Sequence, residues 1–112
     1  MNYFVNEKQR KASQSSCYFE FQKGYYHDVC WLDDSISISD DFWCDYRLSD
    51  LFGRVIKDFN YYGITIVTKE HWKEIVALSR EVGSPWKEVI EEAIPWVNSC
   101  FEANEVFSIL GI

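Results

Sequence analysis

The C-terminal half of the chain contains two consecutive helical patterns, and these constrain the fold more than any other feature. Thr68 suits the N-cap of the first helix, and Gly83 suits the position just after its end. The second helix begins at Ser84-Pro85, because proline at the first helical position loses no hydrogen bond. Pro95 removes a backbone hydrogen bond farther along, so we predict a kink or a break near Ile94. The inner positions of the two helices are Trp72, Ile75, Val76 and Ser79, followed by Trp86, Val89, Ile90, Ala93, Val97, Cys100 and Phe101.

A shorter helical pattern precedes these two and leads directly into a strand pattern. Ser49 or Asp50 is available as the N-cap, and the helix of about ten residues should end near Asn60. Residues 61–67 (YYGITIV) then change to β-branched and aromatic side chains, which suit a buried strand. The C-terminal VFSILGI predicts another buried strand. The apolar positions of the short helix are Leu51, Phe52, Val55, Ile56 and Phe59.

Extended patterns dominate the N-terminal half. Residues 17–22 (CYFEFQ) and 25–32 (YYHDVCWL) flank a turn signal at Lys23-Gly24, so we predict a β-hairpin. Residues 35–39 (SISIS) alternate strictly, which predicts a short strand or a sheet edge. Together with the helices, these strands predict an α+β fold, with an antiparallel or mixed sheet of about four to five strands and about three helices packed on one face.

The size of the chain indicates one domain. A chain of 112 residues, 47% of them hydrophobic, can bury one core but not two. Residues 1–15 are polar and lack a sustained period, so we expect a loose tail or a short first element there. Residues 16–112 then form the single α+β domain.

Composition and spacing exclude several classes of function. A pI near 4.7 disfavours direct binding of nucleic acid, which needs clustered lysine and arginine. No apolar run approaches the ~18 residues that span a bilayer, and no apolar segment follows the N-terminal charges, so we expect no membrane association and a cytoplasmic protein. The five glycines are isolated, so the P-loop, the dinucleotide-binding pattern and the nucleophile elbow are absent.

The cysteines and histidines form no catalytic or metal-binding pattern. There is no CxxC pair, so the spacing predicts four reduced thiols instead of disulfides or a zinc site. Nothing in the spacing places a histidine beside a cysteine as its base. We therefore predict that the chain is not an enzyme and carries no metal or cofactor. The residues concerned are Cys17, Cys30, Cys44, Cys100, His27 and His71.

Acidic and large aromatic residues alternate between Asp28 and Asp50, and this segment carries most of the net charge. Residues 28–50 sum to −6, against +2 for residues 1–27 and −3 for residues 51–112, in a chain of net charge −7. A local acidic field accelerates association with a basic macromolecule, and Trp and Tyr side chains anchor protein interfaces. The segment therefore predicts a partner-binding surface. Its candidate residues are Trp31, Asp33, Asp34, Asp40, Asp41, Phe42, Trp43, Asp45, Tyr46 and Asp50.

Two other interpretations of this segment remain open. Its aspartates could supply oxygen ligands to Ca²⁺ or Mg²⁺, but no glycine lies between Gly24 and Gly53, which excludes the calcium-binding EF-hand loop. The segment could also be a solvated loop that protects a strand edge and places anions at a helix N-terminus. A second acidic group on the outer face of the last helix would extend the same field if the fold brings it alongside. That group is Glu88, Glu91 and Glu92.

A small, acidic, aromatic-rich chain without catalytic residues resembles the immunity proteins that bacteria make against their own secreted or contact-delivered toxins, as in contact-dependent growth inhibition. The segments that carry the resemblance are DDSISISDDFWCDYRLSD (33–50) and, more weakly, WKEVIEEAIPW (86–96). The resemblance is one of type and rests on no family signature. It implies a cytoplasmic protein that binds and neutralises a cognate toxin with a basic surface, such as a nuclease domain.

Two alternative functions use the same aromatic residues differently. In a small cytosolic enzyme or ligand-binding domain, they would line a pocket that also contains a cysteine or histidine. In a homodimeric adaptor, they would form the dimer interface. An immunity-type inhibitor instead predicts a tight protein partner whose association rate depends strongly on salt.

Overall fold

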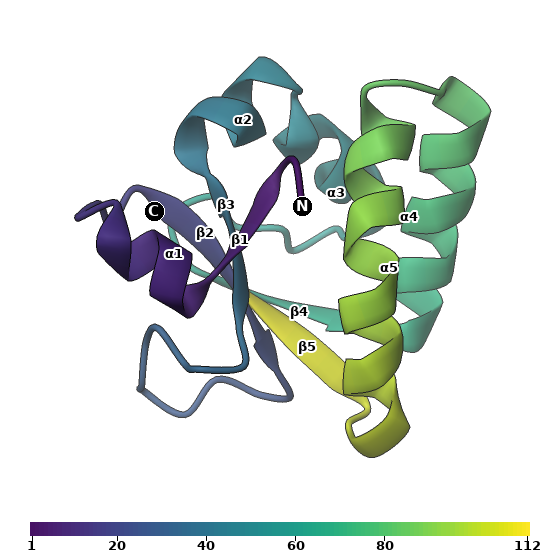
Figure 1. Ribbon diagram of the computed structural model, residues 1–112. Coiled ribbons are helices and arrows are strands. Elements are labelled where there is room, and N and C mark those ends of the chain that lie inside the picture. The colour runs from purple at the N-terminus through teal and green to yellow at the C-terminus, as the bar shows by residue number, and fades with distance from the viewer.

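The computed structural model describes residues 1–112, which form five strands and five helices (Figure 1). The strands make one antiparallel sheet in the order β1-β3-β2-β5-β4. This architecture confirms the predicted α+β class and the predicted size of the sheet. The elements are β1 (Phe4–Asn6), α1 (Glu7–Ala12), β2 (Tyr18–Lys23), β3 (Ile36–Ser39), α2 (Asp40–Asp45), α3 (Leu48–Val55), β4 (Ile64–Thr68), α4 (Lys69–Val82), α5 (Trp86–Ala103) and β5 (Val106–Leu110).

One face of the sheet, the core face, packs its aromatic side chains against α3, α4 and α5, and against Trp43 of α2. Phe21 on β2 contacts the rings of Phe52 on α3 and Trp96 on α5, with centroid distances of 6.3 and 6.2 Å. Phe107 on β5 lies edge-on to Trp72 on α4, at 5.7 Å. Large rings that meet in such geometries supply most of the apolar area that a small core can bury. The helices α3, α4 and α5 therefore cover one face of the sheet, as predicted.

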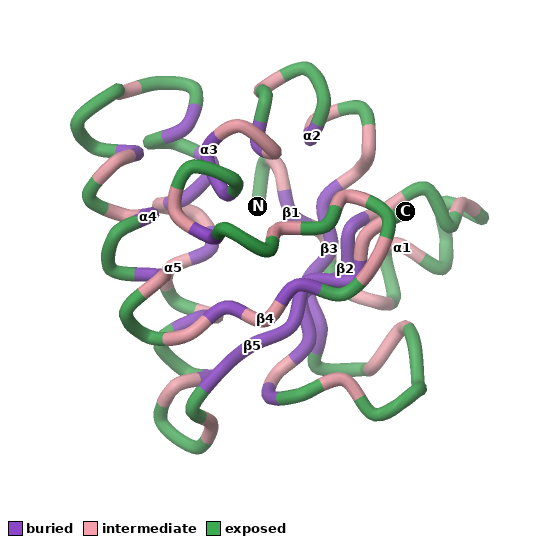
Figure 2. The backbone as a smooth tube through the Cα atoms, turned by 180° about the vertical axis from the view of Figure 1, so that it is seen from behind, coloured by how far each residue is buried: buried purple, intermediate pink, exposed green.

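The opposite face of the sheet, called the outer face below, is polar and covered by α1 and residues 24–35. The Glu20 carboxylate accepts hydrogen bonds from the Trp31 and Leu32 N–H groups, both at 2.8 Å, and from the Ser35 hydroxyl at 2.6 Å. These bonds close the loop over the sheet, so the inner strands β2, β3 and β5 are largely buried (Figure 2). The buried polar residues of the outer face include Glu20, Gln22, Ser37 and Ser108.

The predicted hairpin is wrong, because residues 25–32 form a loop and no strand. β2 pairs with β3 on one side and with β5 on the other. Asp28 and Trp31 have φ angles of 64° and 62°, in the left-handed region that interrupts a strand. β3 lies between β1 and β2, so the SISIS segment is a central strand of the sheet.

The two long helices begin and end close to the predicted positions. Thr68 caps α4 by accepting a hydrogen bond from the His71 N–H, and Gly83 follows the last residue of this helix. α5 runs through Pro95 as one continuous helix, so of the predicted kink or break the break is wrong. Buried residues on both sides of Pro95, such as Val89 and Val97, hold the helix together across it.

Other boundaries differ from the sequence predictions. The N-cap residue of α3 is Arg47, and the helix ends at Val55. Ile56 has an extended backbone and still reaches the core, so its apolar side chain fits the helical spacing although the residue lies outside the helix. Residues 61–67 were predicted to form a buried strand. The strand there is β4, and it lies at the edge of the sheet. Residues 1–15 contain β1 and α1, so they form ordered first elements of the domain.

Two glycines are expected to respond oppositely to alanine. Gly53 lies inside α3, and a methyl group there would meet no atom within 4 Å, so Gly53→Ala should stabilise the protein by about 0.5–1 kcal/mol. A methyl group on Gly111 would lie 2.1 Å from the Tyr61 carbonyl oxygen. Gly111→Ala should therefore cost about 1–3 kcal/mol. Urea unfolding of both variants checks the pair, and equal midpoints would contradict the geometry.

Candidate partner-binding surface

The acidic segment does not form one continuous patch. Asp33 and Asp34 precede β3, whereas Asp40 and Asp41 follow it, and four strand residues separate the pairs by roughly 13 Å. The carbonyl of Asp34 accepts a hydrogen bond from the Trp96 indole at 2.8 Å, which ties this pair to the middle of α5. The fold therefore divides the predicted site between opposite ends of the sheet.

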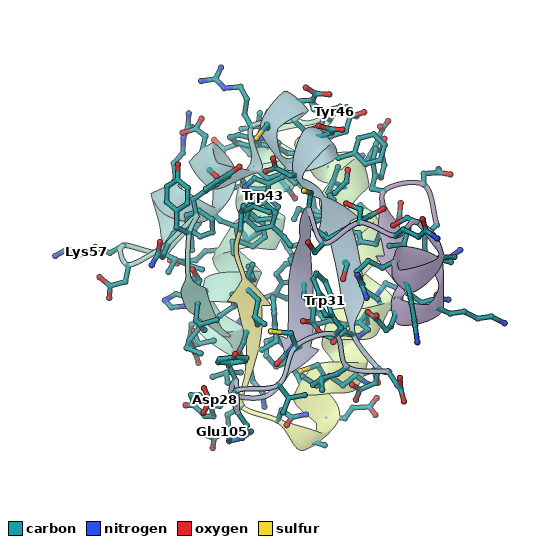
Figure 3. The ribbon with its side chains drawn as sticks, turned by 90° about the vertical axis from the view of Figure 1, so that its left-hand side faces the viewer. Asp28, Trp31, Trp43, Tyr46, Lys57 and Glu105 are labelled. Carbon is teal, nitrogen blue, oxygen red and sulfur yellow. The ribbon has the colours of Figure 1, made fainter.

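Trp43 is a core residue, which corrects its assignment to the binding surface. Its indole is 1% exposed, stacks on Phe19 at 4.1 Å and donates to the Ser49 hydroxyl at 2.7 Å. Trp31 lies on the outer face, where the Arg10 guanidinium sits 4.0 Å above its ring. Figure 3 shows Trp31 in front of the sheet and well away from Tyr46. Neither tryptophan can act together with the helix α2 acids.

Asp40 is engaged within the molecule. At the start of α2 its carboxylate accepts a hydrogen bond from the Tyr61 hydroxyl, and the Cys44 thiol lies 3.6 Å from the same oxygen. The pKa of Tyr61 is raised mainly by its hydrogen bond to Asp40 and, to a smaller extent, by its hydrogen bond to Cys44. Asp40 therefore fastens α2 to the segment before β4.

The structure brings together three partly exposed aromatic rings, called the aromatic cluster below. Phe42 on α2 and Tyr46, the residue just after this helix, stack at 5.6 Å, and Tyr3 meets them edge-on at 5.7 and 5.6 Å. Asp41 and Asp45, both exposed, lie on the same short helix as Phe42. The sequence did not identify Tyr3 as a candidate residue, because Tyr3 lies about 40 residues before its partners and the N-terminal segment has no helical or strand periodicity of apolar residues.

The N-terminal strand also joins the aromatic cluster to α5. The Tyr3 hydroxyl donates to the Glu88 carboxylate at 3.0 Å, and this bond raises the pKa of Tyr3. Glu92 accepts hydrogen bonds from the N–H groups of Asn2, Tyr3 and Phe4, at 2.9 to 3.2 Å. Two members of the second acidic group, Glu88 and Glu92, are therefore linked through Tyr3 to the aromatic rings at α2.

Two surface depressions flank this arrangement. One, of about 340 Å³, lies between Asp45, Asp50 and the ring of Trp86, with Arg54 on its rim. The other, of about 490 Å³, is lined by Glu88, Glu91 and Glu92 together with Tyr3 and Lys87. Both lie next to the turn between α4 and α5. The first hollow has Arg47 and Arg54 beside its two aspartates, so only the second has a mainly acidic wall.

Ion pairing distinguishes the free acids from the neutralised ones. Asp50 pairs with Arg54 at 3.0 Å and Glu91 pairs with Arg80 at 3.1 Å, and this second pair lowers the pKa of Glu91. The only other ion pair joins Arg10 and Glu7 on α1. Four acids beside the aromatic cluster have no ion pair, and we call these acids and the cluster the acidic face. It consists of Asp41, Asp45, Glu88, Glu92, Tyr3, Phe42 and Tyr46.

The acidic face lies in a chain with free cysteines and no metal-binding cluster. All four cysteines are free thiols, and no group of three or more His, Cys, Asp and Glu side chains is placed to hold a metal ion. None of the helices combines the length and the apolar character that a membrane span requires. The fold and the acidic face together define a small α+β protein with an aromatic and acidic surface. No protein-family model, curated protein or solved structure matches the chain.

Proposed function

We propose that the chain is an immunity-type protein that binds a basic bacterial toxin domain through the acidic face and neutralises it. The observation that carries this proposal is the aromatic cluster, which lies at the surface among carboxylates that have no cation of their own. Aromatic side chains anchor protein interfaces, and unpaired acids at their rim attract a basic partner. The resemblance in type to immunity proteins supplies the kind of partner.

The rings of the acidic face are held in place before any partner arrives. Tyr3 is fixed by its contacts with both Phe42 and Tyr46 and by its hydrogen bond to Glu88. An anchor whose rotamer is already fixed loses little entropy on binding, so more of its contact energy contributes to affinity. This arrangement favours a tight complex over a transient one.

The free acids should determine how fast the partner binds. We expect Asp41→Lys combined with Asp45→Lys to slow association about tenfold or more at low salt, because both substitutions reverse the field at the docking surface. The control is Glu102→Lys with Glu105→Lys, which makes the same charge change at the opposite end of α5. Stopped-flow mixing with the partner, recovered from host lysate by affinity capture, measures both rates. Equal slowing by the two double variants would assign the effect to net charge alone and contradict a role of the acidic face in association.

A growth assay tests the biological half of the proposal. The captured partner is expressed in a laboratory bacterium, alone and together with this chain. We expect the partner alone to arrest growth, and the pair to grow normally because the toxin is occupied. A partner that is harmless when expressed alone would rule out the immunity function, whatever its affinity for the acidic face.

A further inference from the structure

The two edges of the sheet differ in their protection. β1 is three residues long, and the N–H of Phe4 that points away from the sheet donates to Glu92 on α5 at 2.9 Å. Glu92 also takes the preceding two N–H groups, of Asn2 and Tyr3. Natural proteins block exposed edges in such ways, because unpaired backbone groups recruit strands from other chains. The β1 edge is thus closed by the protein itself.

The β4 edge has no such cover. The Gly111 N–H donates to the Gly63 carbonyl at 2.8 Å, so every second residue from Gly63 faces β5 and the backbone groups of Ile64 and Ile66 point away from the sheet. The next outward N–H, of Thr68, is taken by the His71 imidazole at 3.2 Å. The N–H and carbonyl groups of Ile64 and Ile66 therefore remain without a partner in the chain.

The side chains along this edge also lack the usual protection. β4 has the sequence ITIVT, without proline, charge or bulge. Tyr62, just before the strand, is 79% exposed, Ile64 is 39% exposed, and the nearby C-terminal Ile112 is 45% exposed. Aromatic and β-branched side chains of this kind pair well across neighbouring strands. The edge has the composition of an interior strand.

The charge distribution indicates which strand can pair there. The chain carries −7 overall, yet the nine residues from Asn60 to Thr68 contain no charged side chain. Two copies that meet at this edge therefore bring no like charges together at the contact, whereas a meeting of two acidic faces would. An antiparallel strand pair is also self-complementary, as a two-fold interface requires.

We propose that the chain forms a homodimer in which β4 pairs antiparallel with β4 of a second copy. In the pairing centred on Thr65, Ile64 of one copy lies opposite Ile66 of the other, and their outward N–H and carbonyl groups exchange hydrogen bonds. The two sheets then continue as one, and Ile64 packs against Ile66 across the two-fold axis. The acidic face lies on α2 and α5, outside this contact, so each copy keeps it free (Figure 1).

Sedimentation of the intact chain over a hundredfold range of concentration tests this dimer. We expect the mass to rise from that of one 13.3 kDa chain to twice that value. Ile64→Lys places a charge on the edge and should raise the dissociation constant at least roughly tenfold. The control is Val82→Lys, which changes another exposed apolar residue, at the end of α4, and should dimerise like the natural sequence. Thermal unfolding confirms that both variants fold.

Hydrogen exchange identifies the surface independently of the variants. With rising concentration, exchange of the Ile64 and Ile66 amides should slow, because these N–H groups become bonded in the dimer, while exposed amides near Asp41 stay unchanged. A monomer at every concentration overturns the proposal. So does a dimer that leaves both isoleucine amides unprotected, or an Ile64→Lys variant that dimerises as tightly as the natural chain. Protection of these two amides without self-association would also overturn the homodimer, because the edge would then pair with a strand from a different protein.

Discussion

Trp43→Ala is expected to lower the free energy of unfolding by about 3–5 kcal/mol, the range for removing a large aromatic side chain from a packed core. The indole lies between Phe19, at 4.1 Å, and the rings of Phe52 and Phe59, at 5.3 and 5.9 Å. The loss combines the transfer free energy of the indole with the cost of the cavity that it leaves. Urea unfolding followed by far-UV circular dichroism measures the change.

A matched variant separates the ring from its hydrogen bond. Ser49→Ala removes only the acceptor of the Trp43 N–H and should cost about 1 kcal/mol, which includes the price of an unsatisfied buried donor. If Trp43→Ala instead kept its stability and lost a binding partner, the burial of this residue would be wrong and its original assignment to the surface would stand.

Trp43 also shows why sequence alone could not define the site. In the sequence it is one of four large aromatics among seven aspartates, and nothing distinguishes it from Phe42 or Tyr46. A short helix after β3 turns Trp43 inward and leaves the other two rings partly exposed. Because α2 is only six residues long, it gives too few turns for a helical period to reveal which side is buried.

Long, strongly periodic segments were predicted well, because they contain enough residues to show a period. α4 has a Thr68 N-cap, a Gly83 end and an apolar stripe, all of which favour the same boundaries. The β5 segment was identified because nearly all its residues are apolar, and all five are buried. Local signals suffice where the element contains its own start, end and period.

The loop of residues 24–35 lacked such signals because its conformation depends on a distant acid. Its aromatic and β-branched residues favour a strand, and Glu20 in the preceding strand gave no sign of its role. Only the fold reveals that the carboxylate takes the N–H groups that a strand would use for its ladder. A long-range hydrogen bond of this kind overrides propensity and leaves no periodic trace in the sequence.

Glu20→Ala is therefore expected to destabilise the protein by about 3 kcal/mol or more, because it leaves one buried and two half-buried donors without an acceptor. Glu20→Gln should cost less, about 1–3 kcal/mol, since its amide keeps one acceptor oxygen and the shape of the side chain. Denaturant unfolding gives both values. Amide exchange at Trp31 and Leu32 should accelerate more than exchange in α4, since the bonds lost are those of the loop.

Ser37→Ala supplies the control for the Glu20 variants. Ser37 is the cross-strand neighbour of Glu20, is equally buried, and has a hydroxyl without a hydrogen-bond partner. Removing that hydroxyl relieves an unsatisfied polar group, so stability should stay level or rise. If Glu20→Ala were as mild as Ser37→Ala, the carboxylate would not hold the loop, and the cover of the outer face would have to come from α1 and the stacking of Arg10 on Trp31.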